Sequence, residues 1–166
     1  FEADGSGGFV QRHAESLVNA SGESENVGLG DTNGDGRKDV LVAARPEMFR
    51  IVSTADNTYT ELAHFNAPSS GNAGTNGGRD LDGDGIEEVT YYDVDINRTY
   101  IYEGTTLIRT INPGLTIGMG DLDADGLGEL VVRNGSTGTG WSIQESDGTG
   151  NTFTTVVSLT TTDAIR

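Results

Sequence analysis

The sequence predicts an all-β chain, and three observations support this prediction. Segments of six to eight residues rich in β-branched and aromatic side chains recur along the chain, as they do in strands. Clusters of Gly, Asn, Asp, Ser and Thr separate these segments, and the 25 Gly residues against 3 Pro indicate tight turns. No segment has the apolar spacing of an amphipathic helix. The 166 residues suit one region of ordinary domain size.

The expected strands follow one another in three runs of four. The first run comprises 27–31, 39–45, 48–55 and 59–66; the second comprises 73–80, 88–94, 98–104 and 106–112; the third comprises 117–121, 129–134, 140–146 and 153–159. The first strand of the second run reads AGTNGGRD, which is polar and rich in glycine. We expect that strand to be short or irregular, because glycine weakens a strand interior.

An acidic loop stands between the first and second strand of each run. The three loops align without gaps over nine positions and begin at Asp31, Asp80 and Asp121, at intervals of 49 and 41 residues. Each loop has an oxygen-bearing side chain at positions 1, 3, 5 and 9 and a glycine at position 6. These side chains are Asp31, Asn33, Asp35 and Asp39 in the first loop, Asp80, Asp82, Asp84 and Glu88 in the second, and Asp121, Asp123, Asp125 and Glu129 in the third.

Calcium accounts for this spacing. Ca²⁺ takes six to eight oxygen ligands, and a loop that curls around it points alternate side chains inward. Glycine at position 6 permits the bend, position 7 supplies a backbone carbonyl and position 9 closes the shell. The position 7 residues are Arg37, Ile86 and Leu127. The sequence therefore predicts three Ca²⁺ sites, although Asp-Gly pairs also form hairpin turns that need no metal.

Other calcium motifs fit less well. An EF-hand loop needs a bidentate Glu at position 12 and a following helix, whereas position 12 is here Val42, Tyr91 or Val132 and a strand follows. Dockerin modules fail for the same reason. A thrombospondin-type repeat would need cysteine, which is absent, and the nine-residue period of a calcium-binding β-roll is missing.

A strand, the pattern D-x-[DN]-x-D-G-x-x-[DE] and a second strand, repeated at this interval, resemble the FG-GAP repeat, also described as the VCBS repeat. This family includes the calcium-binding blades of integrin α-subunit propellers and repeats of many secreted microbial proteins. The resemblance implies antiparallel four-stranded blades of a β-propeller, with the ion between strands one and two of each blade. It divides the chain into a partial blade and three full blades, about three and a half in all, which are 1–26, 27–70, 71–113 and 114–166. A propeller of four to eight blades would then need either other blades of the same parent protein or further copies of the chain.

Charge and composition restrict the partners and the location. A net charge of −16 argues against nucleic acid as a partner, and no apolar run is long enough for a membrane span.

The expected energetics of calcium binding indicate the location. At roughly 10 mM Ca²⁺ and a Kd of about 10⁻⁴–10⁻³ M, each site would contribute about 1.4–2.7 kcal/mol to the free energy of unfolding. Because millimolar Ca²⁺ occurs outside cells, we expect a secreted or cell-surface protein.

No catalytic motif is apparent, so the chain is not expected to be an enzyme. His13 and His64 fall in strand-like segments, where structural roles are more common. The expected role is structural, adhesive or in assembly, and the partners considered are a cell-surface protein or a glycan. Two alternatives remain, a carbohydrate-binding module attached to a polysaccharide-active enzyme and a subunit of an extracellular filament. Sugar binding would require exposed aromatic side chains, for which the candidates are Trp141, Tyr91, Tyr92, Tyr100 and Tyr102, although most of these are expected to pack between blades.

Overall fold

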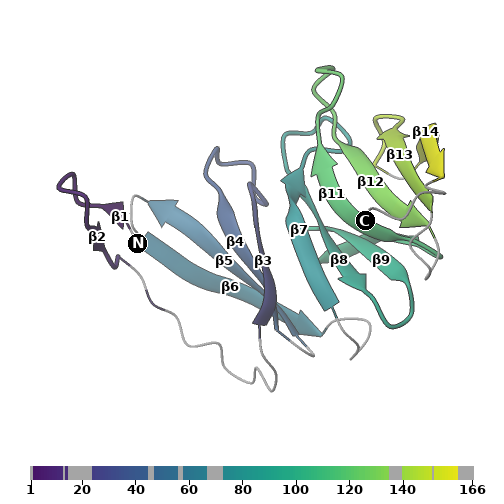
Figure 1. Ribbon diagram of the computed structural model, residues 1–166. Coiled ribbons are helices and arrows are strands. Elements are labelled where there is room, and N and C mark those ends of the chain that lie inside the picture. The colour runs from purple at the N-terminus through teal and green to yellow at the C-terminus, as the bar shows by residue number, and fades with distance from the viewer. Residues whose placement is uncertain are drawn as a thin grey trace.

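The all-β prediction is confirmed. The computed structural model describes residues 2–12, 14, 24–44, 47–55, 58–66, 73–134, 140–150 and 152–160, and among these it contains strands, turns and bends but no helix. Three antiparallel four-stranded sheets follow one another along the chain (Figure 1). None of the described residues forms a helix that could span a membrane.

In each sheet the strands lie in chain order, so that every sheet is a simple meander. The first sheet contains β3 (Ser24–Gly30), β4 (Asp39–Ala44), β5 (Glu47–Ala55) and β6 (Thr58–Asn66). The second contains β7 (Ala73–Arg79), β8 (Glu88–Asp93), β9 (Arg98–Glu103) and β10 (Thr106–Ile111). The third contains β11 (Leu115–Gly120), β12 (Glu129–Asn134), β13 (Gly140–Ser146) and β14 (Phe153–Thr160).

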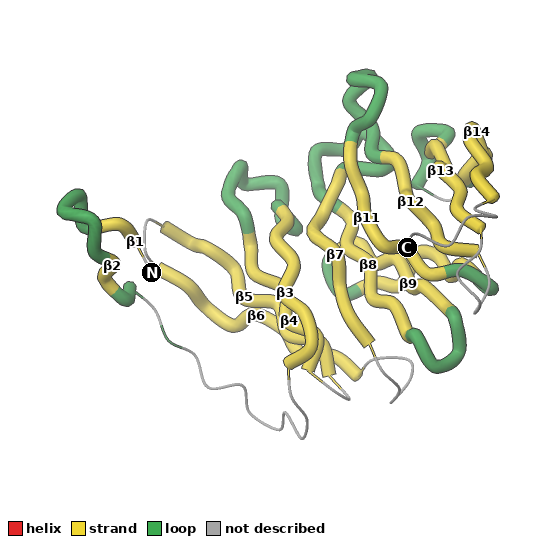
Figure 2. The backbone as a smooth tube through the Cα atoms, in the orientation of Figure 1, coloured by secondary structure: helices red, strands yellow, loops and turns green. Residues whose placement is uncertain are grey.

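The sheets lie side by side and do not close into a ring (Figure 2). A hairpin of two short strands, β1 (Glu2–Ala3) and β2 (Phe9–Val10), precedes the first sheet. The partial blade expected over 1–26 overlaps this hairpin, but residues 15–23 and His13 lie outside the described residues. The backbone of His64 lies in β6.

Strand β7 is irregular, as expected, and its composition has a packing reason. Its pairing with β8 shifts between Asn76 and Arg79. A Cβ atom at Gly77 would lie 2.7 Å from the carbonyl oxygen of Leu29, and one at Gly28 would lie 2.6 Å from that of Asn76. The backbones of β3 and β7 therefore approach one another so closely that only glycine fits at the contact.

Two apolar clusters join neighbouring sheets. Between the first and second sheets the cluster comprises Leu41, Ala43, Met48, Val89, Tyr91, Tyr100 and Tyr102. Between the second and third sheets it comprises Leu81, Ile101, Ile111, Leu130 and Val132, with Ile108, Met119 and Phe153 packed against it. Burying each large side chain of this kind stabilises the fold by about 1.5–3 kcal/mol. Apolar packing between successive sheets therefore stabilises the fold at both junctions.

The tyrosines in the first cluster confirm the expected packing role. Tyr91, Tyr100 and Tyr102 are at most 5% exposed, and the rings of Tyr91 and Tyr100 lie 6.1 Å apart. Burial raises the pKa of Tyr102 to about 12, because the phenolate would lose its hydration. Tyr92 and Trp141 are only partly buried.

Candidate metal centres

Each acidic loop joins the first strand of a sheet to the second. We refer to residues 31–39, 80–88 and 121–129 as the first, second and third loops. Figure 2 shows the three connections as loops at the same end of the three sheets. The glycine at position 6 has a φ of 82° in the first loop, 89° in the second and 98° in the third. These left-handed conformations, which favour glycine, produce the bend that the spacing predicts.

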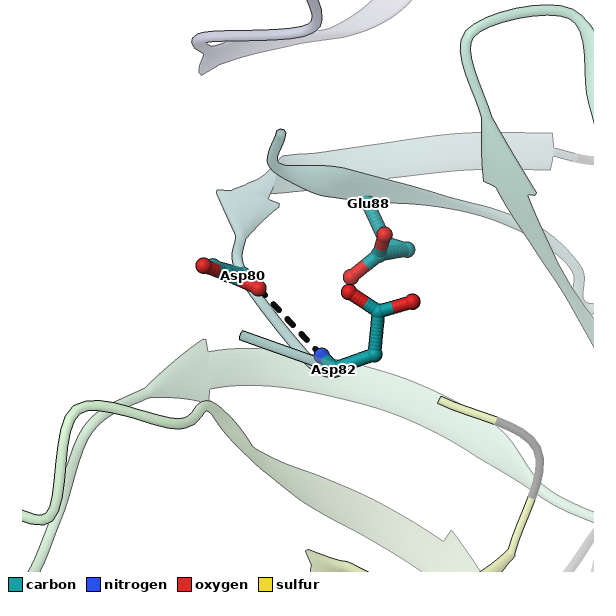
Figure 3. A group of neighbouring side chains, drawn as sticks. All are labelled: Asp80, Asp82 and Glu88. Carbon is teal, nitrogen blue, oxygen red and sulfur yellow. Dashed lines mark hydrogen bonds between the residues drawn. The ribbon is translucent and has the colours of Figure 1, made fainter. Parts of the chain in front are cut away.

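The second loop gathers three carboxylates. Ligand atoms of Asp80, Asp82 and Glu88 all lie within 4.8 Å of one another (Figure 3). Glu88 is 0% exposed, and its Oε2 accepts a hydrogen bond of 2.6 Å from the backbone N–H of Leu81. Its other oxygen, Oε1, is buried and has no hydrogen-bond partner among the described residues. Burial, reinforced by the charges of Asp82 and Asp80, raises the pKa of Glu88 to about 8.

The third loop repeats this arrangement with Asp121, Asp123 and Glu129. Glu129 is 3% exposed, and its Oε2 accepts a hydrogen bond of 2.5 Å from the backbone N–H of Leu122. Its Oε1 is again buried without a partner in the described part of the chain. The pKa of Glu129 is raised by burial and, to a lesser extent, by the neighbouring carboxylates.

A further carboxylate near the third loop is absent from the predicted ligand set. Glu145, on β13, groups with Asp123 and Asp125 within 4.8 Å. It follows Gln144, which pairs with Leu130, so it lies opposite Glu129 across the β12–β13 pair. The register of the β12–β13 pair brings Glu145 to the third loop. The nine-residue motif does not include Glu145 and therefore could not predict its position.

The first loop is arranged differently. Asp39 is 0% exposed, but both of its oxygens have donors. Oδ2 accepts hydrogen bonds from the backbone N–H of Thr32, at 3.1 Å, and from the Thr32 hydroxyl. Oδ1 accepts one of 3.1 Å from the N–H of Ser53, and the Arg50 guanidinium lies 3.9 Å from Oδ2. Among the described residues, no group of three carboxylates is drawn from this loop, so the structure does not bring Asp31, Asp35 and Asp39 together.

Hydrogen bonds within the loops follow the nine-residue pattern. The carboxylate at position 5 accepts a hydrogen bond from the N–H at position 7 in every loop: Asp35 from Arg37, Asp84 from Ile86 and Asp125 from Leu127. Asn33 accepts one of 3.1 Å from the N–H of Asp35. Asp84 is not part of the second loop's carboxylate group, and metal binding by Asp84, by Asn33 and by the position 7 carbonyls remains a prediction.

Successive loops are joined to one another. The N–H of Glu87 donates to the carbonyl of Asp31, and the N–H of Gly128 donates to that of Asp80, both at 2.8 Å. In each case position 8 of one loop binds position 1 of the loop before it. The Glu87 carboxylate also accepts hydrogen bonds from the Asp31 N–H at 2.7 Å and from the Lys38 ammonium at 2.5 and 2.6 Å.

Position 7 side chains strengthen this connection. Ile86 lies 3.4 Å from where a Cβ atom would stand at Gly34, and Leu127 lies 3.5 Å from the same place at Gly83. The position 7 side chains of the second and third loops therefore pack against position 4 of the preceding loop. Ala124, at position 4 of the third loop, also has a positive φ of 65°.

Comparison with known proteins adds no assignment, since no protein-family model and no curated protein sequence matches the chain. The resemblance to FG-GAP repeats therefore depends on the loops and strands described above.

Proposed function

We propose that the chain is an extracellular calcium-binding module in which Ca²⁺ connects the first two strands of a sheet through its acidic loop. The observation that carries this proposal is the pair of buried glutamates at position 9. In Glu88 and Glu129, one oxygen is held by a backbone N–H, and the other is buried beside two aspartates with no hydrogen-bond partner in the described part of the chain. A cation there would supply the missing interaction.

The electrostatics favour a bound cation. Burying a carboxylate without a compensating charge is costly, and here two further carboxylates lie within 4.8 Å of it. The contrast with Asp39 is informative, because that carboxylate has three hydrogen-bond donors and a nearby guanidinium. The second and third loops are therefore the better-supported sites, while a site in the first loop requires Asp39 to exchange these partners for an ion.

The donor chemistry favours calcium among common divalent ions. All the grouped ligands are carboxylate oxygens, and the chain has no cysteine and only two histidines, neither in a loop. Hard oxygen ligands suit Ca²⁺ and Mg²⁺, and a crowded set of carboxylates suits Ca²⁺, the larger ion, which accepts more ligands in less regular geometry. Three Ca²⁺ ions would reduce the formal charge from −16 to −10.

We further propose that the three sheets are blades of a β-propeller with a structural, adhesive or assembly role. Support comes from the simple meanders, the apolar clusters between successive sheets and the close approach of the first strands β3 and β7. The remaining blades would come from the same parent protein or from further copies. We propose that this role is non-enzymatic and that the protein acts outside the cell or on its surface. Burial of Tyr91, Tyr100 and Tyr102 removes them from the surface candidates for sugar binding.

Chelation tests the calcium proposal directly. The thermal unfolding of the 166-residue chain is followed by circular dichroism in EDTA, in 10 mM CaCl2 and in 10 mM MgCl2, with bound Ca²⁺ counted by equilibrium dialysis. Two occupied sites contribute about 3–5 kcal/mol, which corresponds to a rise in Tm of roughly 6 °C or more. Equal Tm values in EDTA and calcium, or no bound calcium, would overturn the proposal. A rise produced equally by magnesium would overturn the choice of ion.

A further inference from the structure

We infer that Glu145, which lies outside the nine-residue motif, is a ligand of the cation in the third loop. This inference rests on the proposed function, because it assigns a fifth carboxylate to one of the proposed sites. Asp123 connects the two groups of oxygens: it lies within 4.8 Å of Asp121 and Glu129 in one group and of Asp125 and Glu145 in the other. The third centre thus draws on a strand as well as on its loop.

A buried, unpaired oxygen marks this place independently of the acidic cluster. Glu129 is 3% exposed, and its Oε1 has no hydrogen-bond partner among the described residues. The Glu129 carboxylate groups with those of Asp121 and Asp123. An oxygen in this condition requires a cation or a donor. A cation that satisfied this oxygen would lie close to Asp123, whose carboxylate also groups with that of Glu145.

The three sheets allow an internal comparison at the position of Glu145. Pairing of Leu130 with Gln144 puts Glu145 opposite Glu129. In the second sheet Val89 pairs with Tyr102, and the next residue along each strand places Glu103 opposite Glu88. In the first sheet the Val40–Ile51 pair puts Val52 opposite Asp39, and valine cannot bind a cation. Of the two glutamates, only Glu145 joins a group of carboxylates in the described residues.

Glu145 has no competing structural role in the described part of the chain. No hydrogen bond or ion pair links its carboxylate to another described residue. Without a cation it adds negative charge beside Asp123 and Asp125, which is unfavourable. With a cation it adds a ligand, and calcium affinity rises with the number of charged ligands. The side chain therefore contributes to stability only when the metal is bound.

The substitution Glu145→Gln tests the inference, with Glu103→Gln as the matched control from the second sheet. Calcium binding to the whole chain is measured by isothermal titration calorimetry, and unfolding is followed in EDTA and in calcium. We expect E145Q to weaken one class of site by about tenfold, while E103Q binds calcium as the wild type does. In EDTA, E145Q should unfold at the wild-type temperature or above it, because a repulsive charge is removed.

The outcomes separate this inference from the proposed function. Wild-type chain that binds no calcium overturns both. Wild-type chain that binds calcium with an unchanged isotherm for E145Q overturns only the assignment of Glu145. A loss of stability in EDTA equal to that in calcium assigns Glu145 a structural role and also overturns the inference. A weakened site in E145Q with unchanged stability in EDTA supports it.

Discussion

The substitution Glu88→Gln should change stability in opposite directions with and without calcium. Glutamine retains an oxygen that can accept the N–H of Leu81, but it carries no charge into the buried position. Its amide can donate toward Asp82, whose carboxylate lies within 4.8 Å of the Glu88 carboxylate. In chelator the variant should therefore be more stable than the wild type. In calcium it should be less stable, because the proposed second site would lose a charged ligand.

The magnitude follows from the pKa of Glu88, which rises from 4.5 to about 8 on folding. Stability from the protonated carboxyl is fully present below pH 4.5 and is lost as the pH rises through about 8. At 1.36 kcal/mol per pKa unit, the shift sets an upper limit of about 5 kcal/mol for the gain from glutamine above pH 8. Even about 2 kcal/mol of that gain would raise Tm by roughly 4–8 °C.

Unfolding should be followed by calorimetry at pH 8.5 in EDTA and in 10 mM CaCl2, and at pH 5 in EDTA, where the advantage of the variant should shrink. The matched control is Asp39→Asn, because Asp39 already has donors on both oxygens. Asparagine would replace one of the two oxygens with an NH₂ group, which cannot accept the hydrogen bond of the donor that faces it. The control variant should therefore lose stability both with and without calcium. If Glu88→Gln were destabilising in EDTA at pH 8.5, the reasoning from burial would be refuted.

Two further predictions concern the backbone. Gly77→Ala should lower the free energy of unfolding by about 1–3 kcal/mol, because its Cβ would stand 2.7 Å from the Leu29 carbonyl oxygen. Urea denaturation measures this, and Gly118→Ala, where a Cβ would have no neighbour within 4 Å, should cost less than about 1 kcal/mol. Ala124→Gly should raise the free energy of unfolding by about 0.5–1 kcal/mol, because a φ of 65° strains alanine but not glycine. Equal effects at the two glycines, or a loss at Ala124, would contradict these expectations.

The strands were predictable from the sequence because their signals are local. The segments 129–134 and 140–146 match β12 and β13 residue for residue, since turn residues bound them on both sides. The irregularity of β7 was also expected from its glycines. The reason for those glycines was not accessible, because it depends on the distant strand β3.

The candidate metal centres were only partly predictable. The alignment treats Asp39, Glu88 and Glu129 as equivalent, yet of these three only Asp39 has donors from the described residues on both carboxylate oxygens. Position 2 makes part of the difference: it is Thr32 in the first loop, whose hydroxyl binds Asp39, and leucine in the other two. The hydroxyl was visible in the sequence, but the contribution of Arg50 from β5 depends on tertiary structure. Glu145 required the strand register.

Backbone hydrogen bonds connect position 8 of the second and third loops to position 1 of the loop before each, so that the three loops are joined in a continuous row. The first residue of a candidate metal site is thus also an anchor for the following sheet. The conformation of a loop and the angle between two sheets cannot vary independently, because Asp31 and Asp80 take part in both. An insertion in the first or second loop would therefore be expected to disturb the hydrogen bond that joins this loop to the next sheet.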